Sequence, residues 1–103
     1  MQHHHDKLLL LIDRLPQYNT PRGVDELSNI FLEYKSILDI VNNTDDNLKR
    51  NTSLYYSEIT NIEFNIKQSQ YAKSKKQKDL AFNDAVSGLK SDIGALATLI
   101  ENH

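Results

Sequence analysis

Four histidines are the side chains best suited to metal or acid–base chemistry, and all of them lie at the ends of the sequence. The run from His3 to His5 could bind Zn²⁺ or Ni²⁺, but adjacent histidines in a flexible lead lack fixed geometry and carboxylate support. His103 is the last residue, so no histidine falls within a predicted core helix. The predicted core helices therefore offer no histidine that could activate a nucleophile or form an acid–base pair.

The acidic residues form no catalytic arrangement either. Asp25 with Glu26 and Asp45 with Asp46 are neighbours in sequence rather than carboxylates facing each other across a cleft. Acids near helix starts stabilise the helix dipole without any catalytic role. The sequence also has no cysteine, no glycine-rich phosphate loop, and no spacing typical of a zinc or calcium motif. We expect a non-enzymatic protein with no catalytic residue, metal site, cofactor or small-molecule substrate.

One stretch of the sequence is strongly basic, although the chain as a whole has a formal net charge of −2. Its lysines, which have no acid among them, are Lys67, Lys73, Lys75, Lys76 and Lys78. Together with Tyr71 they are the best candidates for contact with nucleic acid, phosphate or an acidic protein surface. The alternative is solvated charge at the tip of a helical hairpin, where lysines complement the negative pole of a helix.

Length and composition predict one all-α domain. The chain has 103 residues, of which 39% are apolar and 25% charged, and only three glycines and two prolines interrupt it. The longest apolar run, Leu8 to Ile12, is shorter than the about 7–15 residues of a signal sequence core or the about 20 of a membrane span. We therefore expect no membrane span, and we favour an intracellular location without fixing it.

The first predicted helix is short and starts at an N-cap, Asp6. It ends before Pro16, because proline disfavours helical geometry in the residue that precedes it. Residues 1–5 are expected to form a disordered lead, outside a single helical-bundle domain that comprises residues 6–103.

A second helix is predicted from Thr20 and Pro21, an N-cap followed by a proline, to about Asn42. The run of Asn, Thr and Asp residues at 42–47 favours a turn, because these side chains hydrogen-bond to nearby backbone. However, apolar residues spaced by seven continue in phase across this run, so one long helix is the alternative.

Two further helices are predicted in the second half of the chain. One carries Leu48 and runs to about Tyr71, and the other spans about residue 75 to Glu101. The apolar repeat falls out of register between them, and Ser74 with Gln77 matches a capping box. These features predict a hairpin at this point.

The most regular pattern in the sequence lies in the last predicted helix. Apolar residues recur there in steps of four and three, at Phe82, Val86, Leu89, Ile93, Leu96 and Ile100. Such a seam packs lengthwise against another helix, and we expect it to bind a protein partner or a second copy of the chain. Beside it lies a row of mostly small residues suited to close helix approach, namely Ala81, Ala85, Gly88, Asp92 and Ala95.

A second apolar patch is predicted on the third helix, comprising Leu54, Tyr56 and Phe64. It is interpreted either as core beneath the first helix or as a surface for another molecule, since Tyr is favoured at partner surfaces.

These patterns together predict an all-α, antiparallel bundle of three long helices preceded by a short one, with coiled-coil-like seams. We expect a protein–protein interaction module that acts as a homo-oligomer or as a helical subunit or adaptor of a larger complex. The alternative is a regulatory or accessory factor that contacts nucleic acid or an acidic partner through the basic cluster from Lys67 to Lys78.

Overall fold

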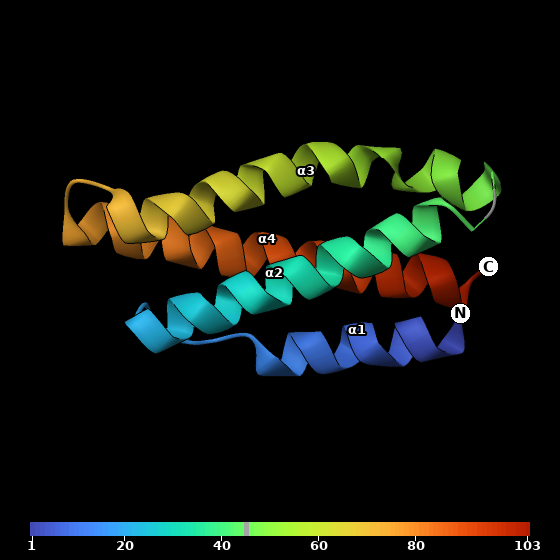
Figure 1. The fold of residues 1–103 in the computed structure, drawn as a ribbon, viewed down its shortest axis with the longest axis horizontal. Coiled ribbons are helices and arrows are strands. Elements are labelled where there is room, and N and C mark those ends of the chain that lie inside the picture. The colour runs from blue at the N-terminus through green and yellow to red at the C-terminus, as the bar shows by residue number, and fades with distance from the viewer. Residues whose placement is uncertain (45) are drawn as a thin grey trace.

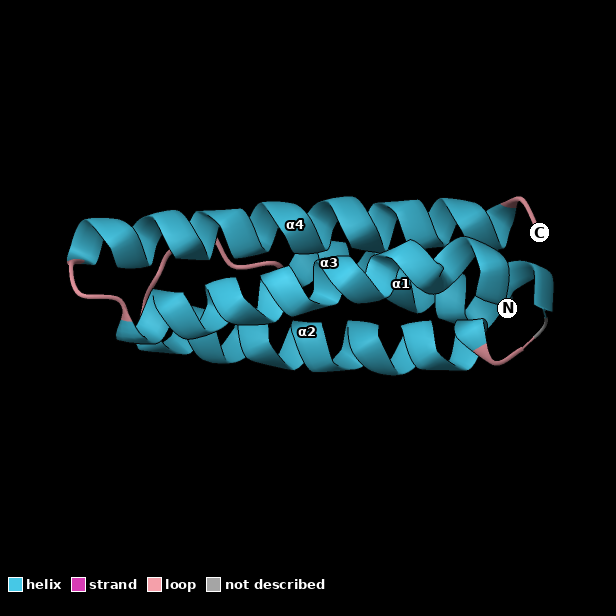
Figure 2. Cartoon of the chain, turned by 90° about the horizontal axis from the view of Figure 1, so that it is seen from above, coloured by secondary structure: helices cyan, strands magenta, loops and turns pink. Residues whose placement is uncertain are grey.

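Four helices run antiparallel along the molecule in this computed structural model, which describes residues 1–44 and 46–103 (Figure 1). In chain order they are α1 (Gln2–Arg14), α2 (Pro21–Asn42), α3 (Asp46–Tyr71) and α4 (Lys75–Glu101). Each helix packs on the next and α1 also packs on α4, so the bundle closes on itself within 43 × 23 × 16 Å. Both termini lie at one end, and α1 covers only part of the bundle's length (Figure 2). The predicted antiparallel bundle of three long helices and a short one is confirmed.

Local hydrogen bonds set the helix starts that the sequence predicted. The Thr20 hydroxyl accepts a hydrogen bond from the Gly23 N–H at 3.0 Å, and the first residue of α2 is a proline. The Ser74 hydroxyl accepts one from the Gln77 N–H at 3.1 Å at the start of α4. Each bond satisfies an amide that the first turn of a helix leaves without a partner.

The chain breaks between α2 and α3, so the alternative of one long helix is wrong. Asn43 and Thr44 close the end of α2 by donating side-chain hydrogen bonds to the backbone oxygens of Asp39 and Ile40, both at 2.8 Å. Asp45, which belongs to the predicted turn, lies outside the described residues.

Helix α1 begins at Gln2 rather than at Asp6, so residues 2–5, which were expected to precede the first helix, form its first turn. Within the helix, the Gln2 amide donates a hydrogen bond to the Asp6 carboxylate at 2.9 Å. His5 lies 3.8 Å from the carboxylate of Glu101 in the last turn of α4. This neighbour comes from the other end of the chain, so local sequence patterns gave no sign of it.

The seam of α4 forms the centre of the core instead of an exposed interface. Phe82 is 1% exposed, while Leu89, Ile93 and Leu96 are fully buried. Ile100 is also buried, Val86 is half-buried, and α4 contacts all three other helices. Packing within the chain already covers most of these side chains, and their assignment to a protein partner stays a prediction.

The row of small residues beside the seam lies largely against α3. Ala81, Ala85 and Asp92 are buried, whereas Ala95 is exposed. A Cβ atom added at Gly88 would lie 3.1 Å from Cγ1 of Ile62, so the two helices approach closely at this level. The small side chains therefore serve the α3–α4 contact.

The patch on α3 does not form core beneath the first helix, so that interpretation is wrong. Leu54 and Phe64 are 73% and 58% exposed, and α1 packs on α2 and α4. Tyr56 is half-buried and donates a hydrogen bond to Asp39 of α2 at 2.7 Å. Burial, followed by this hydrogen bond, raises the pKa of Tyr56 to about 12. Tyr56 thus ties α3 to α2, and a role for Leu54 and Phe64 as a partner surface stays a prediction.

Candidate functional site

The five clustered lysines lie where α3 meets α4, at the opposite end of the bundle from the termini (Figure 1). We call this surface the lysine end; it comprises Lys67, Lys73, Lys75, Lys76 and Lys78. Lys78 is half-buried and the other four lysines are exposed. The hairpin predicted from the sequence therefore brings these cations together at one end of a long molecule.

Only part of this positive charge is compensated. Lys67 lies 3.8 Å from Glu63, and Lys75 lies 3.0 Å from Asp79. Both pairs are solvent-exposed and join neighbouring turns of one helix, so each contributes little to stability. The remaining lysines make no ion pair within the described residues; they are Lys73, Lys76 and Lys78. The lysine end therefore presents a local excess of positive charge to solvent.

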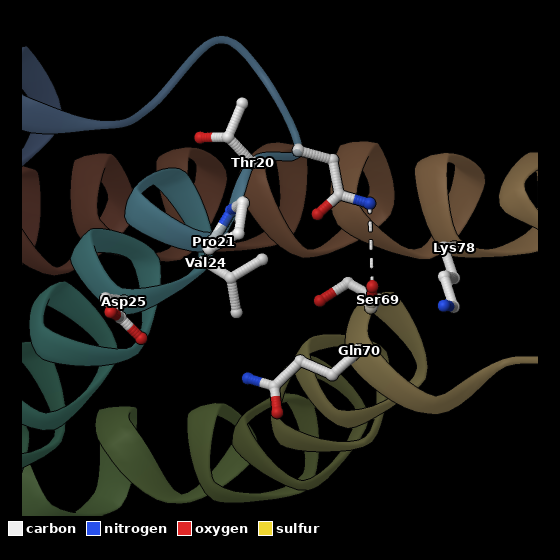
Figure 3. A pocket seen from close by; sticks show the side chains of 8 residues that line it. Thr20, Pro21, Val24, Asp25, Ser69, Gln70 and Lys78 are labelled. Carbon is white, nitrogen blue, oxygen red and sulfur yellow. Dashed lines mark hydrogen bonds between the residues drawn. The ribbon is translucent and has the colours of Figure 1, made fainter.

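Asn19, in the connector between α1 and α2, links three segments at the lysine end. Its side-chain amide donates a hydrogen bond to the Asp79 carboxylate at 3.0 Å and a longer one, 3.5 Å, to the Ser69 carbonyl oxygen. Figure 3 draws the second bond as a dashed line at Ser69. The hydrogen bond from Asn19, followed by that from Lys75, lowers the pKa of Asp79. Asn19 thus connects the start of α2 to the end of α3 and the start of α4.

Replacing this amide is expected to loosen the lysine end. Asn19→Ala removes both hydrogen bonds and should lower the free energy of unfolding by about 1 kcal/mol, measured by urea denaturation. Hydrogen exchange should rise in the last turn of α3 and the first turn of α4. Asn29→Ala is the matched control, because Asn29 is an exposed residue of α2. Equal exchange in the two variants would contradict the role given to Asn19.

A surface pocket of about 400 Å³ lies beside Asn19. Figure 3 shows Pro21 and Val24 on one side of it and Ser69, Gln70 and Lys78 on the other. Asp25 also lines the pocket, so a carboxylate and an ammonium group face the same space. This mixture of charges is poorly suited to a simple anion, and the exposed lysines around the pocket are the stronger candidates for binding.

A second cluster of titratable groups lies inside the bundle, where α2, α3 and α4 meet. Asp92 of α4 is 4% exposed, and Tyr34 of α2 is fully buried. Burial is the main cause that raises the pKa of Asp92 to about 7, and the acidic side chain of Glu58 raises it further. Burial also raises the pKa of Tyr34, to which the charge of Asp92 adds. The Tyr34 hydroxyl and Asp92 Oδ2 make no hydrogen bond within the described residues.

Sequence reasoning placed Asp92 in the row of small residues and missed this polar cluster. The signal that could have found it is an acid at a core-facing position of a helix, since Asp is almost never fully buried unless it has a partner. Glu58 lies on a different helix, and nothing in the sequence around it predicted that it would lie near Asp92.

His5 is placed between two carboxylates, 3.3 Å from Asp6 and 3.8 Å from Glu101. Among residues 1–44 and 46–103, no group of three or more His, Asp or Glu side chains could hold a metal ion.

No protein-family model, curated protein or solved structure matches the chain. The described helices include none that is long and apolar enough to span a membrane.

Proposed function

We propose that the chain is a non-enzymatic interaction module that binds an acidic protein partner through the lysine end. The observation that supports this proposal most is the group of three lysines, Lys73, Lys76 and Lys78, that lack a carboxylate partner within the described chain. The apolar seam of α4 is already covered within the chain, so the charged surface is the better candidate for an interface.

The distribution of charge supports an electrostatic mode of binding. The formal net charge of the whole chain is −2, so the chain outside the lysine end is net acidic. Such a polarised molecule approaches an acidic surface with one end first, which speeds association and fixes its orientation. An interface of this kind gains more in specificity and association rate than in affinity.

Reversing two exposed charges should test this surface without disturbing the core. For Lys73→Glu/Lys76→Glu we expect roughly tenfold weaker binding to poly-L-glutamate, because two attractions become repulsions. Binding of the unsubstituted chain should also weaken steeply as salt is added, since exposed charges are screened. Isothermal titration calorimetry at two salt concentrations measures both effects.

The matched control reverses two exposed charges at the other end of α3. Lys49→Glu/Arg50→Glu makes the same change in net charge, and both residues are exposed. This variant should retain binding to within about twofold, since distant surface charges are screened beyond roughly 10 Å. Equal losses in the two double variants would show that net charge, and not the lysine end, controls binding.

A nucleic-acid partner is the second candidate, because Tyr71 is 77% exposed among the lysines. An exposed aromatic ring beside cations can stack on an unpaired base, which contributes about 1–3 kcal/mol. Tyr71→Ala should then weaken binding of a single-stranded oligonucleotide and leave binding of poly-L-glutamate unchanged. Preferential binding of the oligonucleotide by the unsubstituted chain would favour this candidate over the acidic protein.

A further inference from the structure

The pocket beside Asn19 has walls that are held in place. Asn19 donates hydrogen bonds to the Ser69 carbonyl oxygen at 3.5 Å and to the Asp79 carboxylate at 3.0 Å, so the connector, α3 and α4 are tied together around it. Val24 of α2 is 6% exposed and Ser69 of α3 is 3% exposed, so packing fixes both walls. The pocket, of about 400 Å³, is therefore a feature of the packed bundle rather than a gap between mobile side chains.

Opposite charges lie on opposite sides of this pocket. Figure 3 shows Asp25 on the side of α2 and Lys78 on the side of α4, and Ser69 and Gln70 lie between them. Neither Asp25 nor Lys78 makes an ion pair within residues 1–44 and 46–103. Lys78 is half-buried, so binding of a carboxylate immobilises it at a smaller entropy cost than a fully exposed lysine. The pocket thus offers one position for an ammonium group and another for a carboxylate.

Uncharged groups line the pocket between the two charges. The Gln70 side-chain amide makes no hydrogen bond within the described chain, so it can donate to and accept from a peptide group. Pro21 and Val24 form an apolar wall on the other side, against which a small apolar side chain can pack (Figure 3). A ligand that fills this space therefore has a charge at each end and a peptide group with small side chains between them.

The same arrangement disfavours simple ions. An anion attracted by Lys78 also meets the carboxylate of Asp25, and a cation attracted by Asp25 meets the ammonium group of Lys78. A molecule that carries both charges at matching ends satisfies both groups and is repelled by neither. The two groups lie on different sides of the pocket. A ligand whose charges are separated by a peptide group therefore fits better than a single amino acid, whose charged groups are attached to one carbon.

We propose that this pocket binds short peptides with free termini, of which a dipeptide is the smallest. The ammonium group of the ligand pairs with Asp25, its carboxylate pairs with Lys78, and the Gln70 amide hydrogen-bonds to its peptide group. The site goes beyond the proposed interface with an acidic protein, in which a carboxylate such as that of Asp25 would be unfavourable.

Titration of the full chain with L-alanyl-L-alanine, followed by two-dimensional amide NMR, tests the proposal. The backbone signals of Val24, Ser69 and Gln70 should shift saturably at millimolar concentrations of the dipeptide. The same dipeptide with an acetylated amino terminus and an amidated carboxyl terminus should bind at least about tenfold more weakly, because it carries neither charge. L-alanine should also bind more weakly. Equal affinity for either compound, or the absence of saturable shifts, would overturn the proposal.

Two single substitutions test the charged groups of the pocket separately. Asp25→Asn and Lys78→Gln should each weaken binding of the dipeptide by about fivefold, since each removes one ion pair from the complex. Their matched controls, Asp84→Asn and Lys90→Gln, change exposed residues of α4 outside the pocket. The controls should retain the affinity to within about twofold, because distant surface charges are screened. Equal losses in the test and control variants would show that the pocket charges have no specific role.

Asp25→Asn also separates this site from the lysine end. The substitution removes a negative charge, so binding of poly-L-glutamate should persist while binding of the dipeptide weakens. If Asp25→Asn binds both ligands as tightly as the unsubstituted chain does, the proposal for the pocket fails while the proposed function stands.

Discussion

Leu89→Ala is expected to lower the free energy of unfolding by about 2–5 kcal/mol, because it creates a cavity in a fully packed core. Leu89 is 0% exposed and lies in the middle of α4, the helix that contacts all three others. Urea denaturation followed by circular dichroism measures the loss directly. The variant should remain helical at low temperature, since only one core side chain is shortened.

Leu80→Ala supplies the matched control on the same helix. Leu80 is 54% exposed, so its truncation removes little buried surface and should change stability by less than about 0.5 kcal/mol. The pair also distinguishes packing within the chain from packing between chains. If Leu89 lined an interface, its truncation would lower the mass measured by light scattering while the fold remained intact, which would contradict the structure.

The starts of α2 and α4 were predictable because they depend on local chemistry. Ser74 caps its own helix, and Pro21 can only begin one, so three to four neighbouring residues decide each boundary. The start of α1 was not predictable in this way, because His5 contacts Glu101 at the far end of the sequence. Local patterns therefore describe helices well where the caps are local and poorly where a distant helix stabilises the end.

The role of the seam was not predictable from its spacing. Periodicity shows that one face of a helix is buried but does not say which helix covers it. Leu96 and Ile93 would follow the same pattern in a dimer of hairpins and in a closed bundle. The short α1 decides between these structures, since it packs on both α2 and α4 and closes the fourth side.

In the candidate site, too, the features that depend on nearby residues were predictable, and those that depend on distant residues were not. The lysine end was predictable because its cations are close in sequence, and a hairpin keeps them together. Asn19 was missed because it reaches Asp79, which is 60 residues further along the chain. The Asp92–Glu58 pair was missed for the same reason, since neither acid on its helix indicates that the other lies opposite.

Gly23→Ala is the second substitution with a large expected effect. Gly23 is buried in the first turn of α2, where an added Cβ would overlap the carbonyl oxygen of Tyr18 and lie 3.2 Å from the Thr20 hydroxyl. The obstacle at Tyr18 is backbone, so the connector itself must move. We expect a loss of about 1–3 kcal/mol, typical of overpacking, in thermal or urea denaturation.

Gly94→Ala on α4 is the matched control and should have the opposite sign. Apart from the neighbouring residues and backbone of its own helix, nothing lies within 4 Å of the position that its Cβ would take, so the methyl group meets no obstacle. Alanine is the better helix former, and we expect a gain of about 0.5–1 kcal/mol. A stabilised Gly23→Ala would mean that the connector yields freely. In that case Asn19, which the connector carries, could not hold the lysine end in one arrangement.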